Sequence, residues 1–156
     1  MTQLVSLKDA IDSILAGISA SGQPECVPVT QALGRILAEP LLAVIDSPPY
    51  TNSAMDGFAL RVADSGRELL VSQRIAAGQV PEPLALGTAA RIFTGAQLPD
   101  GADMVVMQED CEVHGDSVRV PLRGDVGENV RLRGHEIKAG EKLLAAGERL
   151  GPPALG

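Results

Sequence analysis

The residues of this chain best suited to chemistry lie between a pair of prolines and an apolar run. Residues 48–60 read PPYTNSAMDGFAL, so Asp56 belongs to an Asp-Gly pair that follows the small polar residues Asn52 and Ser53. Consecutive prolines stiffen the backbone and lack amide donors, and Asp-Gly favours a tight reversal. The pattern predicts a carboxylate held at a rigid loop tip, an arrangement more useful to an enzyme than to a core. The alternative is an ordinary turn or helix-cap acid.

A second candidate is the run Thr94-Gly95-Ala96, which follows an apolar segment. Its hydroxyl and an open backbone amide at Gly95 could be offered to an anionic ligand. The alternative is the end of a strand followed by a turn. Strand alternation predicts that Arg91 shares a face with Phe93, points away from Thr94 and is a surface residue.

The third candidate is a charged run near the C-terminus that contains Arg131, Arg133, His135 and Glu136. Guanidinium groups recognise phosphate or carboxylate, and Glu136 could lie near a metal. A solvated charged loop is the alternative interpretation.

Two further groups are weaker candidates. Glu109 follows an apolar strand, where it could serve a site or face solvent. Cys111 and His114 have the separation of a metal-ligand pair, but no second pair accompanies them at zinc spacing, so we expect no zinc site. Phosphate-binding glycine motifs and the G-x-S-x-G nucleophile motif are missing from the sequence.

The composition limits the class of protein. The 156 residues are 45% hydrophobic but only 2% aromatic, so the core must be aliphatic. The net charge of −7 argues against nucleic acid or an anionic membrane as a partner. Two cysteines and no signal-like N-terminus predict reduced thiols and a cytoplasmic location.

Periodicity predicts one amphipathic helix and a series of short strands. The helix is expected over residues 6–18, closed by Gly22 and Pro24. A short strand is expected at Val27 and Val29, followed by a short helix from Thr30 to Leu33. Further strands are expected at residues 41–45, 58–62, 68–75, 88–93, 104–107 and 117–120, separated by Gly and Pro breaks.

These elements predict an α+β fold with two domains. Residues 1–47 and 139–156 would form a discontinuous α/β domain from both chain ends. Residues 48–138 would form an inserted β-rich, barrel-like domain. Residues 152–156 resemble the first turn of another helix.

Three stretches resemble the signatures of the MoeA-type molybdopterin molybdenumtransferases, a family that includes the gephyrin E domain. The first is P-x-x-x-N-S-A-M-D-G-F-A, which begins at Pro48. The second is residues 91–109, RIFTGAQLPDGADMVVMQE, and the third runs from Asn129 to Gly140. They occur in the family's order and spacing and cover essentially the whole chain. Full members continue past residue 156 into a pterin-binding domain and a C-terminal domain, so the resemblance implies an N-terminal portion.

The resemblance implies an enzyme of molybdenum cofactor biosynthesis. Such a transferase takes adenylylated molybdopterin and molybdate, uses Mg²⁺, and releases molybdenum cofactor and AMP. Members are elongated homodimers whose cleft lies between the β domain of one subunit and the pterin domain of the other. The resemblance also implies the same discontinuous domain arrangement.

The resemblance assigns roles to residues that match the motifs. Asp56, Thr94 and Glu136 would be catalytic, and Asp56 would also be a metal ligand, because a carboxylate repels an oxyanion unless Mg²⁺ mediates. The residues that would contact substrate are Asn52, Ser53, Gly95, Arg131 and Arg133. The family's G-E-D reads Gly134-His135-Glu136 here. The second of the two acidic positions keeps a carboxylate, Glu136. At the first acidic position His135 replaces an acid and so removes a negative charge.

We expect the 156 residues to fold but not to insert molybdenum alone, because pterin and nucleotide contacts would lie downstream. Two other classes stay open. The architecture could serve a non-enzymatic scaffold, as in gephyrin, or a stand-alone module that binds small anions.

Overall fold

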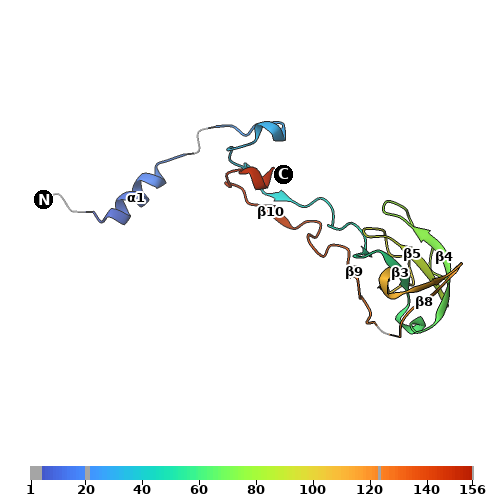
Figure 1. Cartoon of the computed structure of the whole chain (residues 1–156). Coiled ribbons are helices and arrows are strands. Elements are labelled where there is room, and N and C mark those ends of the chain that lie inside the picture. The colour runs from blue at the N-terminus through green and yellow to red at the C-terminus, as the bar shows by residue number, and fades with distance from the viewer. Residues whose placement is uncertain (1–4, 20–21, 123, 156) are drawn as a thin grey trace. The chain divides into compact units, whose positions relative to one another are not determined.

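The computed structural model describes residues 5–19, 22–122 and 124–155. The chain divides into two compact units, which are described separately (Figure 1). One comprises Met1–Glu39 and Ala145–Gly156, and the other comprises Pro40–Leu144. The predicted domain boundaries, 1–47 with 139–156 and 48–138, stay a prediction. The described residues are mostly β, with α1 as their single α-helix.

The unit built from the chain ends contains helix α1, Leu7–Ala16. Ser6 caps its N-terminus by accepting a hydrogen bond from the Asp9 amide at 3.1 Å, as the sequence predicted. Its C-terminal cap is Gly17, so the prediction that Gly22 and Pro24 close the helix was wrong. No residue of α1 is buried.

The rest of this unit departs from the predicted pattern. Val29–Gln31 is a single 3-10 turn after Pro28, not a strand followed by a helix from Thr30. Proline at residue 28 fixes φ and provides no amide, which favours such a turn over a strand. Ile36 and Arg149 form an isolated antiparallel bridge that joins the two ends of the chain. Pro152–Ala154 forms another 3-10 turn.

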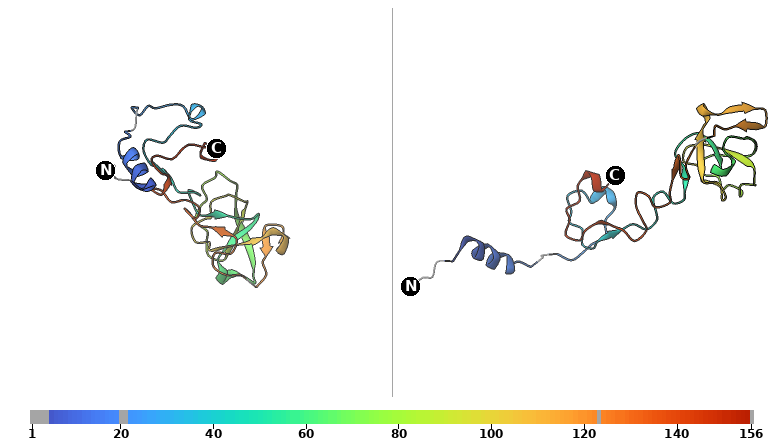
Figure 2. Two further views of the ribbon diagram at one scale, coloured as in Figure 1. Left: turned by 90° about the vertical axis from the view of Figure 1, so that its left-hand side faces the viewer. Right: turned by 90° about the horizontal axis from the view of Figure 1, so that it is seen from below.

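The second unit begins and ends with short paired strands. β1, Leu41–Leu42, pairs antiparallel with β10, Lys142–Leu144. β2, Asn52–Ser53, pairs antiparallel with β9, Val130–Arg131. These ladders run the two chain segments side by side towards the main sheet (Figures 1 and 2).

A six-stranded sheet with the order β6-β3-β5-β4-β8-β7 forms the body of this unit. Its strands are β3 Gly57–Leu60, β4 Glu68–Ile75, β5 Thr88–Ile92, β6 Met104–Met107, β7 Glu112–His114 and β8 Ser117–Arg119. β4 and β5 are parallel and all other neighbours are antiparallel. The predicted strands at 68–75 and 104–107 have the predicted bounds.

Strands β3, β5 and β6 are largely buried on both faces of the sheet, which explains the nearly continuous apolar residues of β3 and β6, whereas β4 and β8 are partly exposed and β7 is fully exposed. One cluster contains Phe58, Leu60, Leu69, Ala89, Met104, Val106, Val118 and Val120. The other contains Ala59, Ile75, Leu84, Ala90, Ile92, Ala96 and Val105. Alternate residues of β3 and β5 therefore enter opposite clusters, and the site lies where these strands meet at one end.

Candidate functional site

Three neighbouring strands of the sheet begin or end at the same level. Gly57, the first residue of β3, lies opposite both Ile92, the last residue of β5, and Met107, the last residue of β6. The sheet register thus brings Asp56 close to Thr94 and Gln108, although these residues are far apart in sequence. A Cβ at Gly57 would lie 2.0 Å from the Val106 carbonyl oxygen, so only glycine allows this approach.

Asp56 and Thr94 are directly bonded. The Thr94 amide donates to Asp56 Oδ1 at 2.8 Å, and Thr94 Oγ1 donates to the same oxygen at 2.7 Å. The amide bond, then the hydroxyl bond, lower the pKa of Asp56 below its ordinary value of 3.8, and the charge of Arg91 contributes in the same direction. Asp56 Oδ2 accepts no hydrogen bond from a described residue. The carboxylate is therefore ionised and oriented, with one oxygen available.

Arg91 belongs to this cluster, contrary to the prediction that it is a surface residue that diverges from Thr94. Arg91 Nη1 donates to the Gly57 carbonyl at 2.8 Å, and Nη2 donates to Gln108 Oε1. Its guanidinium lies 4.6 Å from the centre of the Phe93 ring, so the predicted shared face with Phe93 is confirmed. The side chain turns back over the strand end, which alternation along one strand does not reveal.

The loop before Asp56 is held by internal bonds. Ser53 is fully buried, and its Oγ donates to the Met55 carbonyl at 2.5 Å. The Gly95 amide, expected to be open to an anion, instead donates to the Ser53 carbonyl at 2.8 Å. Ser53 and Gly95 thus fix the loop that carries Asp56.

Asn52 is 7% exposed, and its Nδ2 reaches the Tyr50 carbonyl at 3.5 Å. Its Oδ1 is buried and has no hydrogen-bond partner among the residues that the structure describes. An unsatisfied buried acceptor is costly, so this oxygen needs a donor such as water or a ligand. Arg131 lies opposite Asn52 across the β2–β9 ladder and is exposed.

A second polar cluster lies along the ladder of the same unit. Arg133 Nε pairs with Asp46 Oδ2, and the Ala139 amide donates to Asp46 Oδ1 at 2.8 Å. The Ala139 bond and then the Arg133 bond lower the pKa of Asp46. Sequence reasoning missed Asp46; its position two residues before Pro48 is the local signal that could have marked it as a turn residue.

Glu136 is exposed and accepts a hydrogen bond from Ser47 Oγ at 3.0 Å. No hydrogen bond links it to Asp56 or Thr94 in the described residues. His135 is also exposed, and its amide donates to the Leu132 carbonyl. The structure therefore brings Asp56 together with Thr94, and Glu136 with the Ser47 end of the second cluster.

The remaining candidates do not form a metal centre. Glu109 is exposed and accepts from Gln108 Nε2 at 3.1 Å. His114 lies on β7, where its Nδ1 is 3.5 Å from Glu68 Oε1. Among the residues that the structure describes, no three His, Cys, Asp or Glu side chains are placed to hold a metal.

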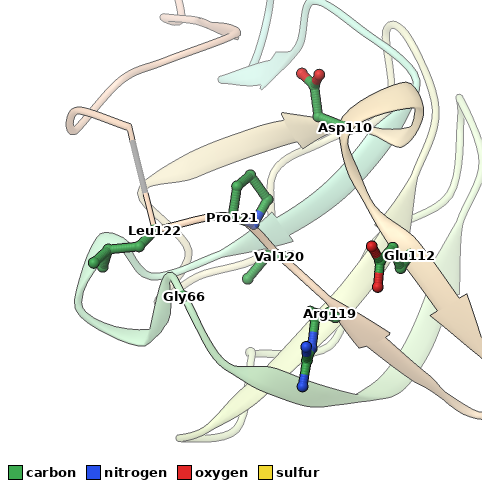
Figure 3. Close-up of a pocket in the computed structure, with 7 residues that line it drawn as sticks. All are labelled: Gly66, Asp110, Glu112, Arg119, Val120, Pro121 and Leu122. Carbon is green, nitrogen blue, oxygen red and sulfur yellow. The ribbon is translucent and has the colours of Figure 1, made fainter.

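A separate surface hollow lies beside β7 and β8 (Figure 3). It is lined by Gly66, Asp110, Glu112, Arg119, Val120, Pro121 and Leu122. None of the site residues predicted from the sequence lines it. The described helices include none with the length and apolar character needed to cross a bilayer.

The comparisons with known proteins agree with the three sequence signatures. A family model described as the MoeA N-terminal region (domain I and II) matches residues 5–156. The chain belongs to the MoeA family. It is 36% identical to a molybdopterin molybdenumtransferase of Synechococcus elongatus, with 97% of this chain and 40% of that protein covered. A Nostoc molybdopterin molybdenumtransferase is 39% identical, with 96% and 37% covered.

Solved MoeA structures share the fold. A crystal structure of a molybdopterin biosynthesis MoeA protein from Pyrococcus horikoshii OT3 matches with a TM-score of 0.85 and 34% identity. The match covers 98% of this chain and 42% of that one. The chain thus spans about 40% of the length of the relatives it matches.

Proposed function

We propose that this MoeA chain serves the molybdenumtransferase reaction named for its relatives, within molybdenum cofactor biosynthesis. The substrates would be adenylylated molybdopterin and molybdate, and the products would be molybdenum cofactor and AMP. The observation that supports this most directly is the Asp56 carboxylate, held by two bonds from Thr94 at the strand ends. Such pre-orientation suits a group that acts on a reacting ligand rather than one that stabilises a turn.

In this proposal each residue has a limited task. Thr94 keeps Asp56 ionised and orients it, so that Oδ2 faces the ligand. Ser53 and Gly95 hold the loop, and Arg91 supplies a positive charge beside the carboxylate. We retain Glu136 as a catalytic candidate and Asn52, Arg131 and Arg133 as substrate contacts. The unsatisfied Oδ1 of Asn52 supports a ligand or water at that position.

Mg²⁺ fits this site only as a shared ion. Magnesium is often held by one or two carboxylates together with substrate phosphates and water. Asp56 Oδ2 would be the ligand from the described residues, and the bound ion would neutralise charge between this carboxylate and an oxyanion. The substrate and the rest of the protein would supply the other ligands.

We further propose a homodimer, a cytoplasmic location and the discontinuous two-domain arrangement, as the family resemblance implies. No observation favours a scaffold function or a stand-alone anion-binding module over the transferase.

The experiment is a chimera in which this chain replaces the matching region of the Synechococcus elongatus enzyme. We expect the chimera to form molybdenum cofactor and the 156-residue chain alone to form none, because the relatives are more than twice as long. Asp56→Asn in the chimera should reduce the rate by about a hundredfold or more, because loss of the carboxylate charge removes the proposed ligand of a metal ion that stabilises charge in the transition state. Thermal unfolding should change little.

Asp116→Asn is the matched control, because Asp116 is an exposed acid at the β7–β8 turn of the same unit. It should leave the rate unchanged. An inactive chimera that is folded, or equal rates for Asp56→Asn and the unmodified chimera, would contradict the proposed function.

A further inference from the structure

Two guanidinium groups lie over the half-buried aromatic ring of Phe93. Arg74 Cζ is 4.5 Å from the centre of the Phe93 ring, and Arg91 Cζ is 4.6 Å from it. Arg74 on β4 and Arg91 on β5 are direct neighbours in the parallel register. We call Arg74, Phe93 and Arg91 the arginine stack. A cation over an aromatic face is held in place by the ring's negative face, so both guanidinium groups have a defined position.

Among the described residues no ion pair holds either guanidinium of the arginine stack, although the Asp56 carboxylate lies near enough to Arg91 for their charges to interact. Arg91 donates to the neutral acceptors Gly57 O, Ile92 O and Gln108 Oε1. Arg74 makes no hydrogen bond or ion pair with any residue that the structure describes, and it is exposed. Arg74 and Arg91 are adjacent positive charges that repel each other. Arg74, the member of the stack without a hydrogen-bonded or charged partner among the described residues, is therefore suited to a negatively charged ligand.

The arginine stack adjoins the Asp56 cluster through the chain itself. Thr94 follows Phe93 directly and is bonded to Asp56. Arg91 contacts the carbonyl of Gly57, the residue after Asp56. An anion on the stack would therefore lie beside the ionised Asp56 carboxylate, and the shared Mg²⁺ proposed at Asp56 Oδ2 would offset their repulsion.

We propose that the arginine stack binds the tetrahedral oxyanion of the substrate, either a phosphate group or molybdate. The inference rests on the proposed function, because it gives the anionic part of that substrate a place beside Asp56. Arg74 would make the main contact, since its donors are unused and a guanidinium fork matches two oxygens of a tetrahedral anion. Arg91 would hold the ring and add charge, because its two Nη atoms already donate inward.

The test titrates the 156-residue chain, in the presence of Mg²⁺, separately with inorganic phosphate, molybdate and AMP, and follows the amide NMR shifts. We expect saturable shifts at Arg74, Phe93 and Thr94. Arg74→Gln should weaken this binding about tenfold, the effect of losing a hydrogen-bonded charge. Arg119→Gln is the matched control, because it removes one exposed positive charge from β8 of the same unit. It should leave the dissociation constant within about twofold.

Equal affinity for phosphate and molybdate would assign the stack to any tetrahedral dianion, whereas tighter binding of AMP would assign it to a nucleotide phosphate. The proposal is overturned if shifts at Phe93 and Thr94 are absent, or if Arg74→Gln and Arg119→Gln weaken binding equally. That result would leave the chimera's activity and the effect of Asp56→Asn untouched, so the two proposals fail separately.

Discussion

The Asp56 carboxylate is defined by two donors from a single residue. The amide bond from Thr94 depends only on the backbone, whereas the Oγ1 bond depends on the side chain. The amide bond is also the larger cause of the lowered pKa. The two contributions can therefore be separated by one substitution.

Thr94→Val should raise the pKa of Asp56 but leave it below 3.8, because the larger amide contribution is retained. A lowered folded pKa means that the ionised carboxylate stabilises the fold. This stabilisation is fully present above 3.8 and is lost as the pH falls through the lower folded value. Carboxyl carbon NMR from pH 6 to pH 2 would measure the pKa directly. An unchanged pKa of Asp56 in Thr94→Val would show that the hydroxyl bond does not contribute to the lowered pKa. Thr88→Val, the same replacement at the first residue of β5, is the control.

At the residue scale the sequence was informative where the signal was local. Asp-Gly and the small residues before it predicted a positioned acid, and Thr94 was a candidate. The position of Arg91 could not be predicted, because its partners lie on β3 and after β6. Asp46 was missed for the same reason: its partners Arg133 and Ala139 are 87 and 93 residues away in the sequence.

At the scale of elements, the site depends on how tightly β3 and β6 approach. Gly57 and Gly95 both flank the Asp56 cluster, yet they are glycine for different reasons. Gly57 has no room for a side chain against Val106, whereas Gly95 has open space but a φ of +79°. The first requirement is steric and the second is conformational.

Gly57→Ala should destabilise the fold by about 3 kcal/mol or more, because the new methyl group would overlap a backbone oxygen of a buried strand. Gly95→Ala should cost about 1 kcal/mol, the penalty for a left-handed conformation without a clash. Urea unfolding of both variants measures the loss in the free energy of unfolding. A larger loss in Gly95→Ala than in Gly57→Ala would contradict the packing at Gly57. Gly78→Ala is the control for Gly95→Ala, because Gly78 also has a positive φ and open space around it and should lose a similar free energy of unfolding.

Elements with many apolar residues were predicted best from the sequence. β4 and β6 have the predicted bounds, and their side chains pack into the two clusters. β7 was not predicted, because all three of its residues are exposed and it is defined only by pairing with β8. The ladders β2–β9 and β1–β10 are likewise made by partners far apart in the chain. Short strands of this kind carry little local signal.

At the scale of the whole molecule, buried apolar residues are distributed unequally. All residues of both core clusters lie between Pro40 and Leu144. In the other unit helix α1 buries none of its residues, and Ala32 and Leu150 are the buried hydrophobic residues among those of this unit that the structure describes. Because burial of apolar surface is the main favourable term in folding, most of the stability should reside in one unit.

We therefore expect a peptide of residues 40–144 to fold alone and to unfold close to the temperature of the 156-residue chain. Its ladder β1–β10 ties the two ends together, which limits fraying at the new termini. Thermal unfolding and amide NMR would compare the two chains, with matching shifts at Asp56 and Thr94 as the measure of an intact site. As a control, Leu15→Asp in the full chain should leave the unfolding temperature unchanged, since Leu15 lies exposed on α1. An unfolded 40–144 peptide would mean that the unit built from the chain ends stabilises the sheet, despite its small core.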